Sequence, residues 1–218
     1  MADQKLKQGF NSLSRFYDLL LLFTSGRTIV KSQVSQIKNL PYCPKALLIG
    51  EGTGNFLKEL AISGNVQHIV YLDISEGMCQ LAQKKLKTIN HKAQIEYRIG
   101  GFEQLPEGEL FDLISTNYFL DVFTSAQLDI YIPLLFSHLK KGGIWYCSDF
   151  YTPPKLRVKD YLFEPILSIL YLFFRLICRI PANKLPPSFE KLAYYGLQEQ
   201  SAKYFFCGLI KSSINIKR

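Results

Sequence analysis

The sequence predicts an α/β protein: a doubly wound three-layer sandwich with a mostly parallel seven-stranded sheet between two layers of helices. Three observations lead to this fold class. Short apolar runs alternate with helical patterns from residue 45 to residue 150, as in sheets whose parallel strands are joined by helices. A glycine-rich turn follows the first apolar run. Two C-terminal strands are joined by Cys207 and Gly208 alone, and so short a connection permits only an antiparallel pair.

A chain of 218 residues is long enough for one domain with a buried core, and 48% of its residues are hydrophobic. This composition is typical of a globular rather than a disordered chain. We divide the single domain, 1–218, into a helical N-terminal cap (1–40), a core (45–150), a helical insertion that is a candidate substrate lid (155–191) and a C-terminal strand pair (197–216).

The elements follow in order. Apolar residues recur at spacings of three and four from residue 5, and a second helical stretch follows Ser25 and Gly26. Ser75 is the expected N-cap of a helix in the core, and Pro133 is expected to interrupt another. The expected strands are 46–49, 68–72, 94–99, 111–116, 144–148, 198–206 and 208–216, and the helices between them are 55–63, one after Ser75, and 125–139.

The glycine-rich turn carries the strongest functional signal. Gly50, Gly52 and Gly54 lie between a strand and a helix, where a ligand can approach the backbone and the first helical N–H groups. A dinucleotide-binding turn has its third glycine one position later, and that position here is Asn55. The spacing therefore favours a different nucleoside ligand.

Asp73 supports nucleoside binding because it ends the next expected strand. An ionised carboxylate has acceptor sites on both oxygens and can accept hydrogen bonds from two ribose hydroxyls.

The G-x-G-x-G turn resembles the first motif of the class I, Rossmann-like S-adenosylmethionine-dependent methyltransferases. Residues 111–117 resemble the fourth strand of that family, residues 139–143 the turn before the fifth strand, and the two final strands its antiparallel pair. With the helical N-terminus, which includes Tyr17, the layout is similar to small-molecule members such as quinone-biosynthesis C-methyltransferases. The resemblance implies S-adenosylmethionine as cofactor and methyl transfer to a small, lipophilic or aromatic acceptor.

The resemblance also implies a set of cofactor contacts. The expected residues are Gly50, Glu51, Gly52, Gly54, Asp73, Ile74, Phe102, Glu103 and Asn117. Two positions depart from the family pattern. Leu48 stands where members often have an acid, for which Glu51 is the expected substitute near the methionine amine. Gly101 stands where many have an aspartate, so Phe102 and Glu103 are the expected contacts to adenine.

Methyl transfer requires neither a protein nucleophile nor a metal, and no metal site is expected. A general base is needed only when the acceptor must lose a proton. The candidates are Tyr118, Asp149 and Tyr17, and a structural role is the alternative for each.

The net charge of +8 leaves three kinds of partner open: an anionic small molecule, a membrane surface and nucleic acid. A small-molecule acceptor is favoured over nucleic acid. Enzymes that methylate adenine or glutamine amides resemble one another in an Asn- or Asp-Pro-Pro-Tyr loop after the fourth strand, whereas this chain has Asn117-Tyr118-Phe119-Leu120 there, without prolines. The alternatives are an RNA or protein methyltransferase and a non-catalytic S-adenosylmethionine-binding domain. The basic residues of the first alternative would be Lys84, Lys85, Lys87 and Lys92.

Residues 161–179 form the most apolar stretch and are flanked by cations. This pattern predicts an acceptor pocket walled by a helix and weak peripheral contact with anionic membranes. Packing on the N-terminal helices is the alternative. The N-terminus has no signal-peptide pattern and the cysteines are odd in number and scattered, which predicts a cytoplasmic protein. Monomer and homodimer both stay open.

Overall fold

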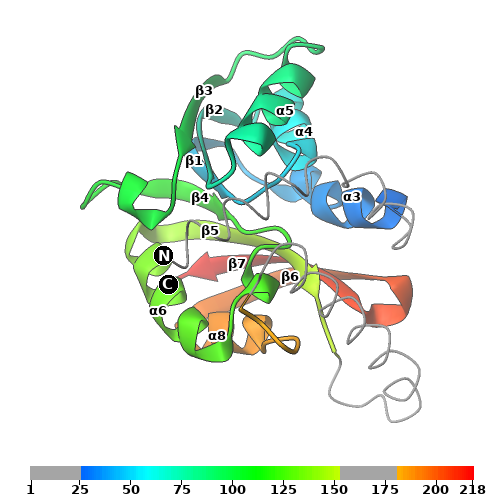
Figure 1. The fold of residues 1–218 in the computed structure, drawn as a ribbon, viewed down its shortest axis with the longest axis vertical. Coiled ribbons are helices and arrows are strands. Elements are labelled where there is room, and N and C mark those ends of the chain that lie inside the picture. Colours follow the sequence, from blue (N-terminus) through cyan, green and yellow to red (C-terminus); the bar gives the residue numbers. More distant parts are fainter. Residues whose placement is uncertain (1–25, 153–180) are drawn as a thin grey trace.

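The computed structural model describes residues 26–152 and 181–218, which are built around a seven-stranded sheet in the order β3-β2-β1-β4-β5-β7-β6 (Figure 1). The strands are β1 Cys43–Ile49, β2 Val66–Asp73, β3 Gln94–Ile99, β4 Phe111–Ser115, β5 Leu139–Phe150, β6 Leu197–Phe205 and β7 Ile210–Lys217. Neighbours among β1 to β5 are parallel, whereas β7 runs antiparallel to both β5 and β6. The predicted fold class is confirmed.

Helices cover both faces of the sheet (Figure 1). One face carries α3 Gly26–Val34, α4 Asn55–Ser63 and α5 Glu76–Leu86, and the other carries α6 Ser125–Ser137 and α8 Ser188–Tyr194. Each face has its own core. Phe56 of α4 belongs to the same buried cluster as Leu48, while Leu128 of α6 and Leu192 of α8 belong to the cluster that encloses Trp145. Burial of these apolar side chains, at roughly 25 cal/mol per Å², is the main stabilising contribution to the sandwich.

Most expected elements have the expected position. The helix at 55–63 and the strand at 94–99 have the bounds that were predicted. Ser75 caps α5, since its hydroxyl accepts a hydrogen bond from the Met78 N–H at 3.2 Å. The strand predicted at 144–148 is longer, because β5 pairs with β4 from Leu139 onward and with β7 as far as Phe150.

The predicted interruption at Pro133 is wrong, because α6 continues through it. Proline has no N–H, so the carbonyl of Asp129, four residues earlier, loses its helical partner. The Tyr195 hydroxyl, just after α8, donates to Asp129 Oδ1 at 3.0 Å and lies 3.5 Å from the Asp129 carbonyl oxygen, so it ties the first half of α6 to the end of α8. A capping box between Thr124 and Gln127 fixes the start of the helix.

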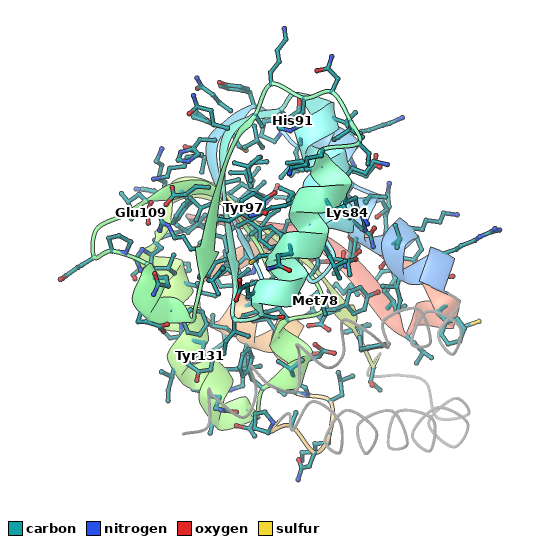
Figure 2. All side chains as sticks on the ribbon, turned by 45° about the horizontal axis from the view of Figure 1, so that its top comes forward. Met78, Lys84, His91, Tyr97, Glu109 and Tyr131 are labelled. Atoms are coloured by element: carbon teal, nitrogen blue, oxygen red, sulfur yellow. The ribbon has the colours of Figure 1, made fainter. Side chains whose placement is uncertain are left out.

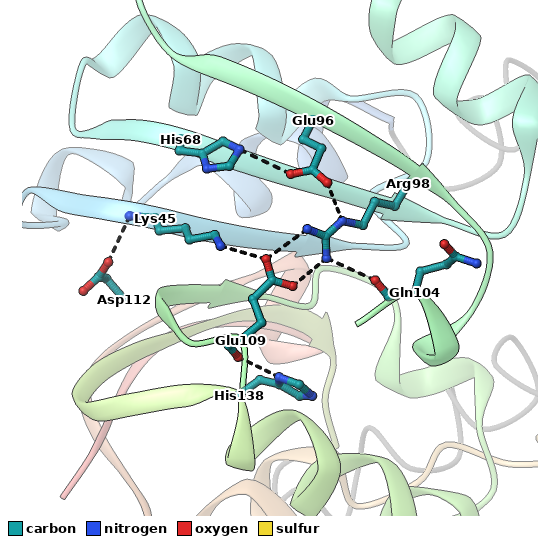
Figure 3. Close-up of polar contacts among 8 residues, drawn as sticks. All are labelled: Lys45, His68, Glu96, Arg98, Gln104, Glu109, Asp112 and His138. Atoms are coloured by element: carbon teal, nitrogen blue, oxygen red, sulfur yellow. Dashed lines mark hydrogen bonds and ion pairs between the residues drawn. The ribbon is translucent and has the colours of Figure 1, made fainter. Parts of the chain in front are cut away.

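A network of ion pairs lies over β1, β2 and β3 beside the connection 100–110 from β3 to β4, which contains a short 3₁₀ turn at Phe102–Gln104 (Figure 3). The Arg98 guanidinium donates to both oxygens of Glu109, at 2.6 and 2.9 Å, and to Glu96 at 2.7 Å. Lys45 pairs with Glu109 at 2.7 Å and His68 lies 3.5 Å from Glu96. Arg98, followed by Lys45, lowers the pKa of the Glu109 carboxyl to about 2. The Glu109 carboxyl therefore stays ionised at neutral pH, between Arg98 and Lys45.

Two sequence predictions lie outside the described residues: the first helix of the cap, with Tyr17, and the apolar stretch at 161–179. Within the described ranges, no helix combines the length and hydropathy needed to cross a membrane. The division of the chain into cap, core, insertion and strand pair stays a prediction.

Candidate active site

Three glycines with positive φ form the turn after β1: Gly50 at +60°, Gly52 at +61° and Gly54 at +74°. L-residues rarely adopt this conformation. A Cβ on Gly50 would lie 2.4 Å from Cδ2 of Phe119, and one on Gly54 would lie 2.8 Å from Cβ of Ala82. The first and third glycines are therefore required by packing as well as by backbone torsion.

Gly52 differs because it faces open space, and a Cβ placed there would meet no atom within 4 Å. The turn leads directly into α4, whose N-cap residue is Gly54 and whose cap has no side-chain hydrogen bond. The first N–H groups of a helix lack partners within the helix and carry its positive dipole end. An open backbone beside a helix N-terminus suits the approach of a polar or anionic ligand group.

Asp73 ends β2 beside this turn, and its side chain is only 6% exposed. Its Oδ1 accepts the Ser75 N–H at 2.8 Å, and the Gly52 N–H also bonds to the carboxyl. Burial raises the pKa of Asp73 to about 7, while the two backbone hydrogen bonds oppose the rise. Ile74, the next residue, is half-buried. A carboxyl is thus held against the open backbone of the turn.

Glu51 is buried within the turn and bonds to the end of β4. Its Oε1 accepts from the Ser115 hydroxyl at 2.5 Å and from the Asn117 amide at 3.1 Å. The side-chain Oδ1 of Asn117 in turn accepts the Ser148 N–H at 2.9 Å. This chain of hydrogen bonds joins the β1 turn to the carboxyl ends of β4 and β5. Burial raises the pKa of Glu51 to about 8 against these hydrogen bonds, and the nearby Asp73 raises it further.

Replacing Glu51 by glutamine should change how stability depends on pH. The pKa of Glu51 rises from 4.5 to about 8 in the folded protein. Its contribution to stability is therefore fully present below pH 4.5 and is lost as the pH rises through 8. Glu51→Gln should become more stable than the wild type by about 1 to 3 kcal/mol between these limits. Urea unfolding from pH 4.5 to 9 measures this, with the exposed Glu107→Gln as control; a pH-independent difference would contradict the burial argument.

The adenine candidates occupy the turn after β3. The Phe102 ring lies 4.7 Å from the Tyr131 ring and 6.2 Å from the Phe119 ring, between centroids, so it adjoins the ring that lies over Gly50. Glu103 is exposed, and its Oε1 accepts the Gly101 N–H at 2.7 Å. Phe102 therefore lies beside the glycine turn, whereas the Glu103 carboxylate accepts a hydrogen bond within its own loop.

Tyr118 follows β4 and has a positive φ of +51°, which is uncommon for a side chain of this size. Its hydroxyl lies 2.7 Å from the Ser32 hydroxyl of α3, and its ring packs edge-on against Phe150. This contact brings α3 to the carboxyl ends of the strands, so the described part of the predicted cap adjoins the site.

Asp149 lies at the end of β5 and is fully buried. It accepts the Phe150 N–H at 2.8 Å and the Asp121 N–H at 3.1 Å. Burial, followed by the neighbouring Asp121 carboxyl, raises the pKa of Asp149 well above its usual range. Both described base candidates reach the edge where parallel α/β sheets bind ligands, and each is already hydrogen-bonded to the protein. The third, Tyr17, is outside the described residues.

Sequence reasoning missed Ser115 as the partner of Glu51 and Ser32 as the partner of Tyr118. Ser115 gave one signal, since its hydroxyl follows the apolar residues Leu113 and Ile114 at the end of the strand, and a buried hydroxyl requires a partner. Ser32 gave none, because its partner lies 86 residues away.

Comparison with known proteins finds a family match for the central part of the chain. Residues 46–143 match the family described as methyltransferase domain. The chain is 29% identical over 124 residues to the demethylmenaquinone methyltransferase of Leptospira interrogans serovar copenhageni, an alignment that covers 55% of this chain and 49% of that protein. The protein of serovar Lai gives the same values. The chain thus spans about half the length of the curated relatives it matches.

Solved structures share the fold at low sequence identity. The magnesium protoporphyrin IX methyltransferase of Synechocystis PCC 6803, solved with bound S-adenosylhomocysteine, has a TM-score of 0.70 and 18% identity, with all of both chains covered. An N-methyltransferase of Bradyrhizobium japonicum WM9 in complex with S-adenosylhomocysteine has a TM-score of 0.60 and 16% identity, covering 89% of this chain and 87% of that one.

Proposed function

From the match of residues 46–143 to the methyltransferase domain family, we propose that this chain transfers a methyl group from S-adenosylmethionine to a small lipophilic or aromatic acceptor. The family match confirms the predicted resemblance to class I methyltransferases, and the solved structures confirm the fold. The observation that carries the proposal is the position of Gly52, beside which a Cβ would enter open space, next to the Asp73 carboxyl at the ends of β1 and β2.

The residues of the turn fit the cofactor. S-adenosylmethionine, when bound, supplies an activated methyl group on a sulfonium. In the proposed site Asp73 accepts hydrogen bonds from the ribose hydroxyls and Ile74 packs beside it. Glu51 faces the α-ammonium group of the cofactor's methionine part. Burial alone keeps the Glu51 carboxyl protonated, and the nearby ammonium cation would stabilise its ionised form. Phe102 packs on the adenine.

Positioning is the main catalytic task of the protein, and orientation alone contributes roughly 7 to 11 kcal/mol to such reactions. In the proposed site the acceptor binds at the ends of β4 and β5, next to the glycine turn. The hydrogen bonds of Asn117 fix these two strand ends relative to Glu51, which keeps the acceptor site in place. Aromatic rings gather here, with Phe119 between those of Phe102 and Phe123. Their apolar faces suit contact with a flat acceptor. The similarity to a relative named demethylmenaquinone methyltransferase also favours such an acceptor.

Calorimetry tests the proposal directly. S-adenosylmethionine and S-adenosylhomocysteine are expected to bind with one-to-one stoichiometry, and NAD is expected not to bind, because the third glycine lies too early for a dinucleotide turn. Transfer of labelled methyl groups to a panel of quinols, phenols and lipids then identifies the acceptor. Tight binding of NAD, or no binding of S-adenosylhomocysteine, would contradict the assignment.

The RNA or protein alternative has less support, because Lys85 is turned inward: its ammonium donates to Thr53 Oγ1 at 3.3 Å and is hydrogen-bonded to Asn55 Oδ1. The other lysines of that group are exposed, among them Lys84 on α5 (Figure 2). A cytoplasmic location, weak peripheral membrane contact and a monomeric or dimeric state stay predictions.

A further inference from the structure

A buried lysine lies on the same edge of the sheet as the proposed site. Lys211 is only 7% exposed, at the start of β7, where it pairs across the ladder with Asp149 of β5. β7 begins where β5 ends, and the Tyr151 N–H bonds to the Leu209 carbonyl at 2.8 Å. Lys211 therefore lies beyond β5 from the glycine turn, on the edge where acceptors are expected.

Three aromatic rings surround the Lys211 ammonium. Nζ lies 4.8 Å from the ring centroid of Phe189, 5.1 Å from that of Tyr151 and 5.9 Å from that of Tyr204. Each distance is within the range of a cation–π contact. The Tyr151 and Phe189 rings meet edge to face with centroids 5.6 Å apart. These rings give the position both a positive charge and flat apolar walls.

The charge is only partly compensated. An ammonium has three N–H donors. Among the described residues, Glu199 is the acidic group within ion-pair distance, with Oε2 at 2.5 Å from Nζ and its own side chain 41% exposed at the rim. Asp149 is opposite Lys211 in the strand ladder, but the ion pair that Lys211 makes among the described residues is with Glu199. Rings attract a cation but accept hydrogen bonds only weakly, so this desolvated ammonium retains capacity for another oxygen anion.

We propose that Lys211 and the rings of Tyr151, Phe189 and Tyr204 select an acceptor that carries an anionic oxygen on a flat ring. The inference rests on the proposed function and narrows its acceptor class. The rings contact the apolar faces of the acceptor, and the ammonium pairs with its anionic substituent. Such a charge-assisted hydrogen bond fixes the orientation of a ring that apolar contacts alone would leave free to rotate.

Binding of a matched pair of probes tests this inference on the full chain saturated with S-adenosylhomocysteine. The probes are 1-hydroxy-2-naphthoate and its neutral carboxamide, titrated by calorimetry. The carboxylate should bind about tenfold more tightly than the amide to the wild type. Lys211→Met should abolish this preference, and Lys211→Arg should retain it. Lys203→Met is the matched control, because Lys203 is an exposed lysine on β6 whose ammonium donates to the Ser35 carbonyl, and it should keep the wild-type preference.

A second variant keeps the test decisive when Lys211→Met does not fold. Glu199→Gln removes the counter-charge at the rim, so it should tighten binding of the carboxylate severalfold and leave that of the amide unchanged. Equal affinities for the two probes, no binding of either, or an unchanged preference in Lys211→Met or Glu199→Gln would overturn the inference. Binding of S-adenosylhomocysteine is measured first, and its failure would instead contradict the proposed function.

Discussion

Asp73→Ala is expected to weaken binding of S-adenosylhomocysteine by at least about a hundredfold. In the proposed site the carboxylate accepts hydrogen bonds from two ribose hydroxyls, and each such bond to a charged group contributes about 1.5 to 3 kcal/mol. The substitution also removes the acceptor of the Ser75 and Gly52 N–H groups, so the turn itself loses support. Calorimetry near pH 8 measures the effect, because the pKa of about 7 leaves the carboxyl mostly ionised there.

The matched control is Asp129→Ala, which removes an exposed acid from α6 on the opposite face of the sheet. This variant should bind the ligand as the wild type does, whatever its stability. For the wild type, affinity should rise with pH through 7 as Asp73 ionises, and in Asp73→Ala only the rise near pH 8 that belongs to Glu51 should remain. If Asp73→Ala bound the ligand with wild-type affinity, the Asp73 carboxyl would not contact the ligand and its proposed role would be wrong.

Gly50→Ala is expected to destabilise the fold by about 2 to 5 kcal/mol. The left-handed conformation costs an alanine about 1 to 2 kcal/mol, and overpacking against Phe119 adds about 1 to 3 kcal/mol. Gly52→Ala is the matched control, since its φ is nearly the same and its Cβ would enter open space, so only the first cost applies. The free energy of unfolding in urea measures both variants.

A double-mutant cycle isolates the steric contribution. Gly50→Ala should cost less when Phe119→Ala has already removed the ring, by about 1 to 3 kcal/mol of coupling. Gly52→Ala should show no such coupling. Equal destabilisation by Gly50→Ala and Gly52→Ala would mean that Phe119 does not restrict the turn.

Local patterns were enough to predict most of the fold. The helix at 55–63 and the Ser75 cap depend on periodicity and on hydrogen bonds between residues a few positions apart. The same holds for the glycine turn, where backbone sterics alone require residues without a Cβ. These features could be predicted because one of their causes lies within a short segment, although packing against Phe119 and Ala82 adds to the requirement for Gly50 and Gly54.

The prediction that failed concerns a contact between distant segments of the chain. Pro133 was expected to break α6, but the helix continues through it and is held to the end of α8 by Tyr195, which donates to the Asp129 side chain 66 residues earlier in the chain. The sequence pattern around Pro133 contains no sign of that tyrosine.

The sequence alone determined the sheet, the order of its elements, and the glycine turn with Asp73 beside it. Only the tertiary structure decided that Glu51 bonds to Ser115 of β4, and that three rings surround Lys211. The reason is physical: backbone sterics and hydrophobic periodicity act between neighbours in the chain, whereas the desolvation of a charged group depends on every segment that packs around it.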